Sequence, residues 1–136
     1  MFRRKRSWIA IWATAAAVHA QEVRTVTISG EVRGATHTHT VYVALWAERG
    51  FLAQPIQEIR IEPGHDARFR FAVAPGRWAI SAYEDRNENG LLDMGLFGPK
   101  EPSGFWRPFR GKHKPHFDEV VVAVDRDCTD VVVALR

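Results

Sequence analysis

Apolar and polar residues alternate with a period of two along most of this chain, and this pattern constrains the fold more than any other feature. The clearest case is residues 67–73, where Phe69, Phe71 and Val73 alternate with Arg68 and Arg70. Successive side chains of an extended strand point to opposite faces, so such a segment has one face for a core and one for solvent. Period-two segments rich in Val, Ile, Phe, Trp and Thr are typical of β-strands.

Seven segments carry this pattern: residues 23–32, 40–47, 56–62, 67–73, 77–84, 117–124 and 130–136. Pro-Gly pairs interrupt it at residues 62–66, where we expect a hairpin loop, and at residues 74–77, where we expect a turn. After the first 20 residues, no run of 10–15 residues has helical apolar spacing with capping residues. We therefore predict an all-β protein, an antiparallel β-sandwich of about seven strands with one long loop at residues 87–116.

The first 20 residues have the composition of a secretory signal peptide. Residues 1–7 contain four basic side chains and no acid, and residues 8–18 are an apolar run that leads to a small-residue cleavage site at Ala20. This run is about half of the roughly 20 apolar residues that span a bilayer. We expect a cleaved signal peptide at residues 1–20, no transmembrane segment afterwards, and a single periplasmic or secreted domain at residues 21–136.

The expected cleavage changes the meaning of the net charge. The whole chain has 19 basic and 16 acidic side chains, a formal charge of +3. The predicted signal peptide holds four of the basic ones, which leaves 15 basic against 16 acidic side chains. A nearly neutral chain gives no electrostatic basis for binding nucleic acid, which we exclude. Cys128 is the single cysteine, and the neighbouring Asp127 and Asp130 disfavour a reactive thiolate.

Residues 85–93 have the spacing of a calcium-binding loop. Carboxylate and amide side chains recur at alternate positions around Gly90, where the backbone must turn sharply. Ca²⁺ takes about six to eight hard oxygen ligands, which such side chains supply. The expected ligands are Asp85, Asn87, Asn89, Asp93 and the backbone carbonyl of Leu91.

The same loop also has a simpler interpretation. Its twelfth position is Leu96, where a helix-loop-helix calcium site has a bidentate Glu, and no flanking helices are expected, so the loop is not an EF-hand. Asp, Asn and Gly are also common turn formers, because Asp and Asn side chains hydrogen-bond to nearby backbone groups. The sequence leaves a weak calcium site and a metal-free turn both open.

A basic and aromatic segment follows at residues 100–116. Its aromatic rings and guanidinium groups suit a sugar or an anionic polymer, such as an envelope polysaccharide, through stacking and charge. The alternative is structural, in which the basic arm pairs with the acidic loop and the aromatic rings cap the core. The candidate ligand surface comprises Trp106, Arg107, Phe109 and Arg110.

Transition-metal binding and hydrolysis are two further alternatives. The pairs His37/His39 and His113/His116 could hold Zn²⁺ or Cu²⁺ if they converged, but nothing in the sequence brings them together, so solvated surface histidines are the simpler interpretation. No nucleophile elbow, phosphate-binding glycine loop or His-Glu metalloprotease helix is present. A small secreted hydrolase that uses Asp85 and Asp93 as a carboxylate pair remains the alternative to a non-catalytic module.

The segment "YEDRNENGLLDMGLFGPKEPSGF", with the later "FDEVVVAVDRDCTDVVVALR", resembles the exported bacterial proteins of domain of unknown function (DUF) family 2141. The stretch "PGRWAISAYEDRNENG" also looks like the strand and loop of transthyretin-like or collagen-binding-B-type sandwiches, which belong with immunoglobulin-like folds. The resemblance covers residues 23–135 and implies a sandwich fold and export, but no activity. Taken together, we expect an exported binding or accessory module of the cell envelope, stabilised by Ca²⁺ at its long loop, whose partner is an envelope polysaccharide or protein.

Overall fold

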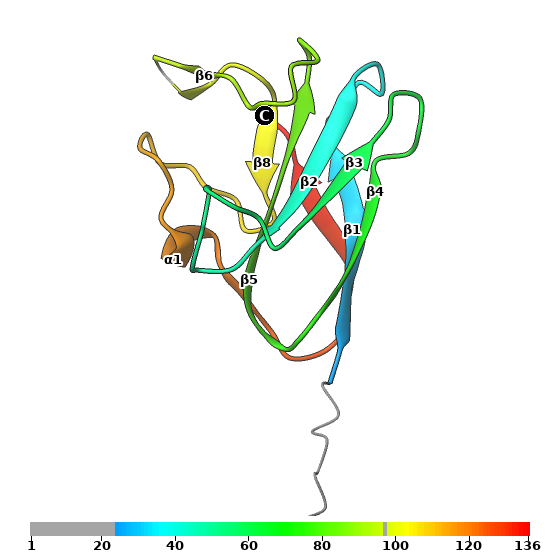
Figure 1. Ribbon diagram of the computed structural model, residues 1–136, viewed down its shortest axis with the longest axis vertical. Coiled ribbons are helices and arrows are strands. Elements are labelled where there is room, and N and C mark those ends of the chain that lie inside the picture. Colours follow the sequence, from blue (N-terminus) through cyan, green and yellow to red (C-terminus); the bar gives the residue numbers. More distant parts are fainter. Residues whose placement is uncertain (1–23, 97) are drawn as a thin grey trace, which may run out of the picture.

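The computed structural model describes residues 24–96 and 98–136, and it consists of two packed β-sheets with one short helix (Figure 1). The three-stranded sheet has the order β10-β1-β4, formed by β1 (Val26–Arg33), β4 (Arg68–Val73) and β10 (Cys128–Ala134). The predicted signal peptide at residues 1–20 lies outside the described residues. The prediction of an all-β sandwich-like fold is confirmed.

The second sheet has five strands. Its main order is β3-β2-β5-β8, formed by β2 (Thr40–Trp46), β3 (Gln57–Ile61), β5 (Gly76–Asp85) and β8 (Ser103–Phe105). The fifth strand, β9 (Val122–Val124), pairs with the first residues of β5, while β8 pairs with residues 81–83 of β5. The long loop of residues 87–116 therefore contains a sheet strand, and it also contains a small ribbon of β6 (Met94–Gly95) and β7 (Gly98–Pro99).

Two expectations about local structure are wrong. Residues 117–124 are not one strand, because α1 (Phe117–Val120) precedes β9. Phe117 and Val120 lie one helical turn apart, and both are buried, so a single turn of helix buries two apolar side chains that a strand would separate. Residues 62–66 are also not a hairpin, because β3 and β4 belong to different sheets. The chain crosses between the sheets at this point.

The main core fills the space between the sheets. It contains the inward-facing residues of the alternating strands, including Ile28, Val43, Phe71, Ile80 and Val133, which are at most 1% exposed. Each fully buried side chain of this size contributes about 1.5–3 kcal/mol through burial of apolar surface. The core therefore accounts for the period-two pattern of the sequence.

The strands also come close together at the β10 side of the sandwich. β10 runs parallel to β1, the one parallel pair among the described strands, with a register shift between Ile28 and Gly30. A Cβ atom on Gly30 would lie 1.9 Å from the carbonyl oxygen of Val131, and one on Gly104 would lie 2.0 Å from that of Ala134. Glycine is thus required at both positions for the backbones to approach.

A second, smaller apolar cluster covers the outer face of the five-stranded sheet. On β2, Ala44 and Trp46 point to this face, opposite the core-facing Val43 and Leu45. Phe117 and Val120 of α1 pack on this cluster, as the position of α1 beside β5 in Figure 1 illustrates. Nowhere in residues 24–96 and 98–136 is there a helix with the length and apolar character needed to cross a membrane.

Candidate functional site

The acidic loop begins where β5 ends, at Asp85. The Asp85 side chain is 1% exposed, and its two oxygens accept the backbone N–H groups of Asn89 at 3.3 Å and Gly90 at 2.6 Å. Glu88 and Gly90 have left-handed backbone angles, with φ of 56° and 76°. Asp85 therefore holds the loop in a tight turn around its own carboxylate.

Tyr83 supports the same turn from the outer face of the sheet. Its hydroxyl donates to the carbonyl oxygen of Gly90 at 3.1 Å, and its ring stacks on Tyr42 with 5.2 Å between the centroids. Burial, followed by the negative charge of Asp85, raises the pKa of the Tyr83 phenol well above its ordinary value. Tyr83 therefore remains protonated and continues to donate.

Asp93 closes the loop from its other end. The Asn89 side-chain amide donates to both carboxylate oxygens of Asp93 at 3.1 Å, and the Asn87 amide donates to Oδ2 of the same group. These bonds, first from Asn89 and then from Asn87, lower the pKa of the Asp93 carboxyl. The structure thus brings the side chains of Asn87, Asn89 and Asp93 together, whereas the Asp85 oxygens bind backbone N–H groups and the Leu91 N–H donates to Oδ1 of Asn89 at 2.9 Å.

Glu101 joins the site from the basic segment, and sequence reasoning missed it. Its side chain is 6% exposed, and its oxygens accept the N–H groups of Arg86 at 2.6 Å and Asp93 at 3.1 Å. One weak signal for it exists, because Glu101 is the one acid among the basic residues of the segment 100–116. One carboxylate therefore clamps both ends of the loop.

Glu84 and Glu88 connect the loop to the segment before β2 and to the first residue of β2. Glu84 is fully buried and accepts the Thr36 N–H at 2.6 Å and the Thr36 hydroxyl at 2.7 Å. Burial opposes the ionisation of Glu84, but the hydrogen bonds from Thr36 and Arg86 outweigh it and lower the pKa of the carboxyl. Glu88 accepts the N–H and hydroxyl of Thr40 at 3.2 and 3.0 Å.

A signal for Glu84 was present in the sequence. Glu84 follows Ile80 and Ala82 at intervals of two residues on β5, and both of these are core residues. A carboxylate in phase with two core residues points between the sheets. Glu84 is therefore placed where it needs the partners that Thr36 provides.

An open hollow of about 450 Å³ lies beside the loop. Basic and acidic side chains both contribute to its walls, so it has no uniform charge. Asp93 and Glu101 offer oxygen atoms there, and the positive charge of Lys100 also lowers the pKa of Asp93. The residues that line the hollow are Arg86, Asn87, Asp93, Met94, Lys100 and Glu101.

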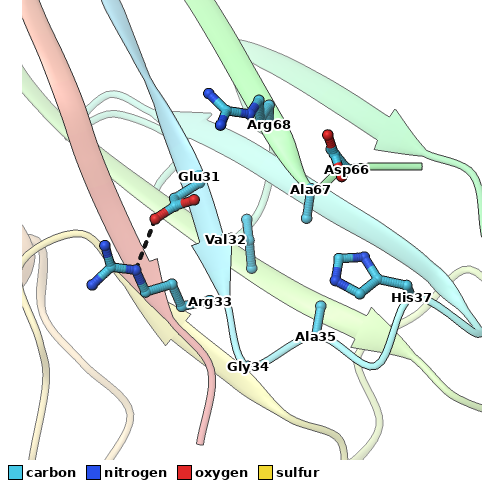
Figure 2. A pocket seen from close by; sticks show the side chains of 9 residues that line it. All are labelled: Glu31, Val32, Arg33, Gly34, Ala35, His37, Asp66, Ala67 and Arg68. Carbon is cyan, nitrogen blue, oxygen red and sulfur yellow. Dashed lines mark hydrogen bonds and ion pairs between the residues drawn. The ribbon is translucent and has the colours of Figure 1, made fainter. Parts of the chain in front are cut away.

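A second hollow, of about 340 Å³, lies near the end of β1 and the start of β4 (Figure 2). Figure 2 shows Glu31 and Arg33 bonded to each other, at 2.8 Å, with His37 on the opposite side. Arg68 and Asp66 add one further charge of each sign. These balanced, exposed charges select no particular ligand.

The four residues of the predicted ligand surface have different surroundings. Trp106 is half-buried against the main core, and Phe109 is half-buried against the second cluster. Arg107 directs its guanidinium to the carbonyl oxygens of Asp118 and Val121, each at 3.5 Å, and Arg110 is exposed. The rings cap the two clusters, and Arg107 contacts the region of α1.

The positions of Asp85 and Asp93 determine whether they can act as a catalytic carboxylate pair. A catalytic carboxylate must come within hydrogen-bond reach of the group whose proton it transfers. Asp85 is buried and binds two backbone N–H groups with its two oxygens, whereas Asp93 is half-buried beside the hollow. The two carboxylates therefore do not face each other across an open cleft.

The fold and this loop define an all-β sandwich with a carboxylate-rich turn at one end of its central strand. The chain belongs to the bacterial family described as "Uncharacterized protein conserved in bacteria (DUF2141)", which matches residues 30–132. The resemblance to this family that the sequence indicates is thus confirmed. No curated protein and no solved structure matches the chain.

Proposed function

We propose that this protein is an exported binding or accessory module of the bacterial cell envelope, and that Ca²⁺ stiffens its acidic loop. The observation that carries the calcium proposal is the convergence of Asn87 and Asn89 on Asp93, beside the buried Asp85 and Glu101. Five carboxylates surround this loop: Glu84, Asp85, Glu88, Asp93 and Glu101. Such a concentration of negative charge favours a bound cation.

The side-chain amides can change their role without movement of the backbone. A carboxamide has nearly the same shape after a half-turn about its last bond, which exchanges the NH₂ group for the oxygen. In the present arrangement, the NH₂ groups of Asn87 and Asn89 donate hydrogen bonds to the charged Asp93 carboxylate. A cation at this point would replace those donors, and each amide would present its oxygen instead, at the loss of the bonds that the Asn89 and Asn87 oxygens now accept from the N–H groups of Leu91 and Asn89.

Calcium binding should raise the melting temperature of the chain. At a free Ca²⁺ concentration ten times the dissociation constant, linkage stabilises the fold by about 1.4 kcal/mol. For a domain of this size, that is a shift of about 5 °C. The experiment compares thermal melts in excess EDTA and in millimolar CaCl₂.

Two matched variants make this experiment specific. Asp93→Asn removes one charge from the loop and should abolish the shift, whereas Asp130→Asn, at an exposed position with φ of 61°, should preserve it. Equal melting temperatures of the wild-type chain in EDTA and CaCl₂ would rule out the calcium site. Export is tested separately by fractionation of the host cell, where we expect a periplasmic or secreted product that begins near Gln21.

The envelope partner calls for a different variant. Trp106→Ala would disturb the main core, because Trp106 packs against it. Arg110 is exposed, so Arg110→Ala changes the proposed ligand surface and leaves the core intact. We expect this variant to weaken binding to anionic envelope polysaccharide at an unchanged melting temperature, and equal binding would exclude Arg110 from the surface.

A further inference from the structure

Three metal-ligating side chains lie together at the start of α1. His113, His116 and Glu119 each offer one ligand atom, and these atoms all lie within 4.8 Å of one another. Among the residues that the structure describes, this is the one group of three or more His, Cys, Asp or Glu side chains with such a geometry. Both histidines are exposed and Glu119 is half-buried, so a cation from solvent can reach all three.

The local fold explains why these side chains meet. Glu119 lies three residues after His116, one helical turn along, and its Oε1 accepts the His116 backbone N–H at 2.9 Å. The same oxygen lies 3.0 Å from Nε2 of His113. The rings of His113 and His116 have centroids 5.7 Å apart. Glu119 therefore already brings both histidine residues to one carboxylate.

The packing on either side holds this arrangement in place. Phe117 and Val120 are buried in the second cluster, which fixes the helical turn that carries Glu119. The Phe109 ring meets His113 edge-on at 5.2 Å. A Cβ atom on Gly111 would lie 2.4 Å from the Phe109 ring, so glycine allows the chain to fold back here.

We propose that His113, His116 and Glu119 bind a transition-metal cation of the zinc class, through two imidazole nitrogens and one carboxylate oxygen. Zn²⁺ accepts this donor set in tetrahedral sites, and three protein ligands leave a fourth position for water. Imidazole suits Zn²⁺ and Cu²⁺, whereas Ca²⁺ takes oxygen ligands. The exposed Lys112 and Lys114 oppose the cation electrostatically, and Glu119 supplies the one negative charge among the ligands.

This site goes beyond the proposed calcium loop and is spatially separate from it. Arg77, near the start of β5, binds Asp118 of α1 at 3.0 Å, whereas Asp85 ends the same strand. Asp85 lies eight positions after Arg77 along the extended strand, a distance of roughly 26 Å. Nδ1 of His39 lies 3.7 Å from Oε1 of Glu84, which is next to Asp85 at the far end of β5. The pair His37/His39 therefore does not converge with the pair His113/His116.

Calorimetric titration of ZnCl₂ into the chain, produced without a histidine tag, tests the proposal. We expect one zinc ion per chain. Loss of an outer-shell partner of a metal weakens binding roughly 10–100-fold, and loss of a direct ligand should cost at least as much. His113→Gln and Glu119→Gln should therefore each weaken zinc binding by about tenfold or more, while the exposed His65→Gln, outside the cluster, should leave it unchanged.

Two further measurements keep the test decisive. Asp93→Asn should leave zinc binding unchanged, as should added CaCl₂, so that failure of the calcium loop and failure of this site are distinguishable. If a variant lowers the melting temperature, electron paramagnetic resonance of the Cu²⁺-loaded wild-type chain decides, because two coupled nitrogens are expected. The proposal is overturned by absence of zinc binding, by binding that His113→Gln and Glu119→Gln leave intact, or by a copper spectrum without nitrogen coupling.

Discussion

Removal of the Glu101 carboxylate is the sharpest test of how the acidic loop is held. Glu101 is 6% exposed and accepts backbone N–H groups of Arg86 and Asp93, at 2.6 and 3.1 Å. Hydrogen bonds to charged groups contribute about 1.5–3 kcal/mol each. Because the two bonds are only partly buried, Glu101→Ala should lower the free energy of unfolding by about 3 kcal/mol, the lower end of their combined range. That is a large part of the roughly 5–15 kcal/mol that stabilises an ordinary domain.

Urea denaturation followed by tryptophan fluorescence measures this effect. Glu101→Gln keeps one acceptor oxygen and should give a smaller loss, so the two variants form a series. Glu62→Ala is the matched control, because Glu62 is an exposed partner of Arg60, and such pairs contribute about 0–1 kcal/mol. A Glu101→Ala variant within about 0.5 kcal/mol of the wild-type chain would refute the view that this carboxylate clamps the loop.

Three other predictions follow from the packing and charge of the fold. Gly104→Ala should lower the free energy of unfolding by about 1–3 kcal/mol or more, because its Cβ would lie 2.0 Å from the carbonyl oxygen of Ala134. Urea denaturation measures this loss, and Gly76→Ala is the control, because a Cβ there would lie 3.6 Å from its nearest atom. Phe117→Ala should cost about 3–5 kcal/mol in the same assay, and an unchanged midpoint would mean that α1 adds nothing to stability. The pKa of Glu84 is lowered in the fold, so the stability from its charge is present above the unfolded value of 4.5 and lost as pH falls through the folded value. Below pH 4.5, the melting temperature of Glu84→Gln should therefore fall less with pH than that of the wild-type chain. If both melting temperatures fall in parallel, the Glu84 charge does not contribute to stability.

The alternation of side chains was enough to predict most strands. On β4, Phe69, Phe71 and Val73 are buried while Arg68 and Arg70 are exposed, as the sequence alone implies. Such a pattern reports which face of a strand is buried, but not which strand lies beside it. The parallel pairing of β1 with β10 and the crossing between β3 and β4 depend on contacts distant in sequence. Periodicity has no information about either.

The site was predictable only where its residues are local. Asn87, Asn89 and Asp93 lie within one turn, so their spacing alone predicts that they meet. Glu101 follows the ribbon of β6 and β7, which brings the chain back to the loop at Arg86. Residue spacing in the sequence does not predict this return. The single helical turn of α1 was missed because four residues are too few to show a 3.6-residue period. Its Val-rich continuation also favours a strand.

The parallel pairing of β1 with β10 has a consequence for the order of folding. Gly30 faces Val131, so β1 gains this neighbour only after the whole intervening chain has been synthesised. Joining segments so distant in sequence carries a large loop-closure entropy and makes folding slow. A nascent chain therefore cannot complete its three-stranded sheet until its last strand has been made, and the edge of β1 that β10 will cover stays unpaired until then.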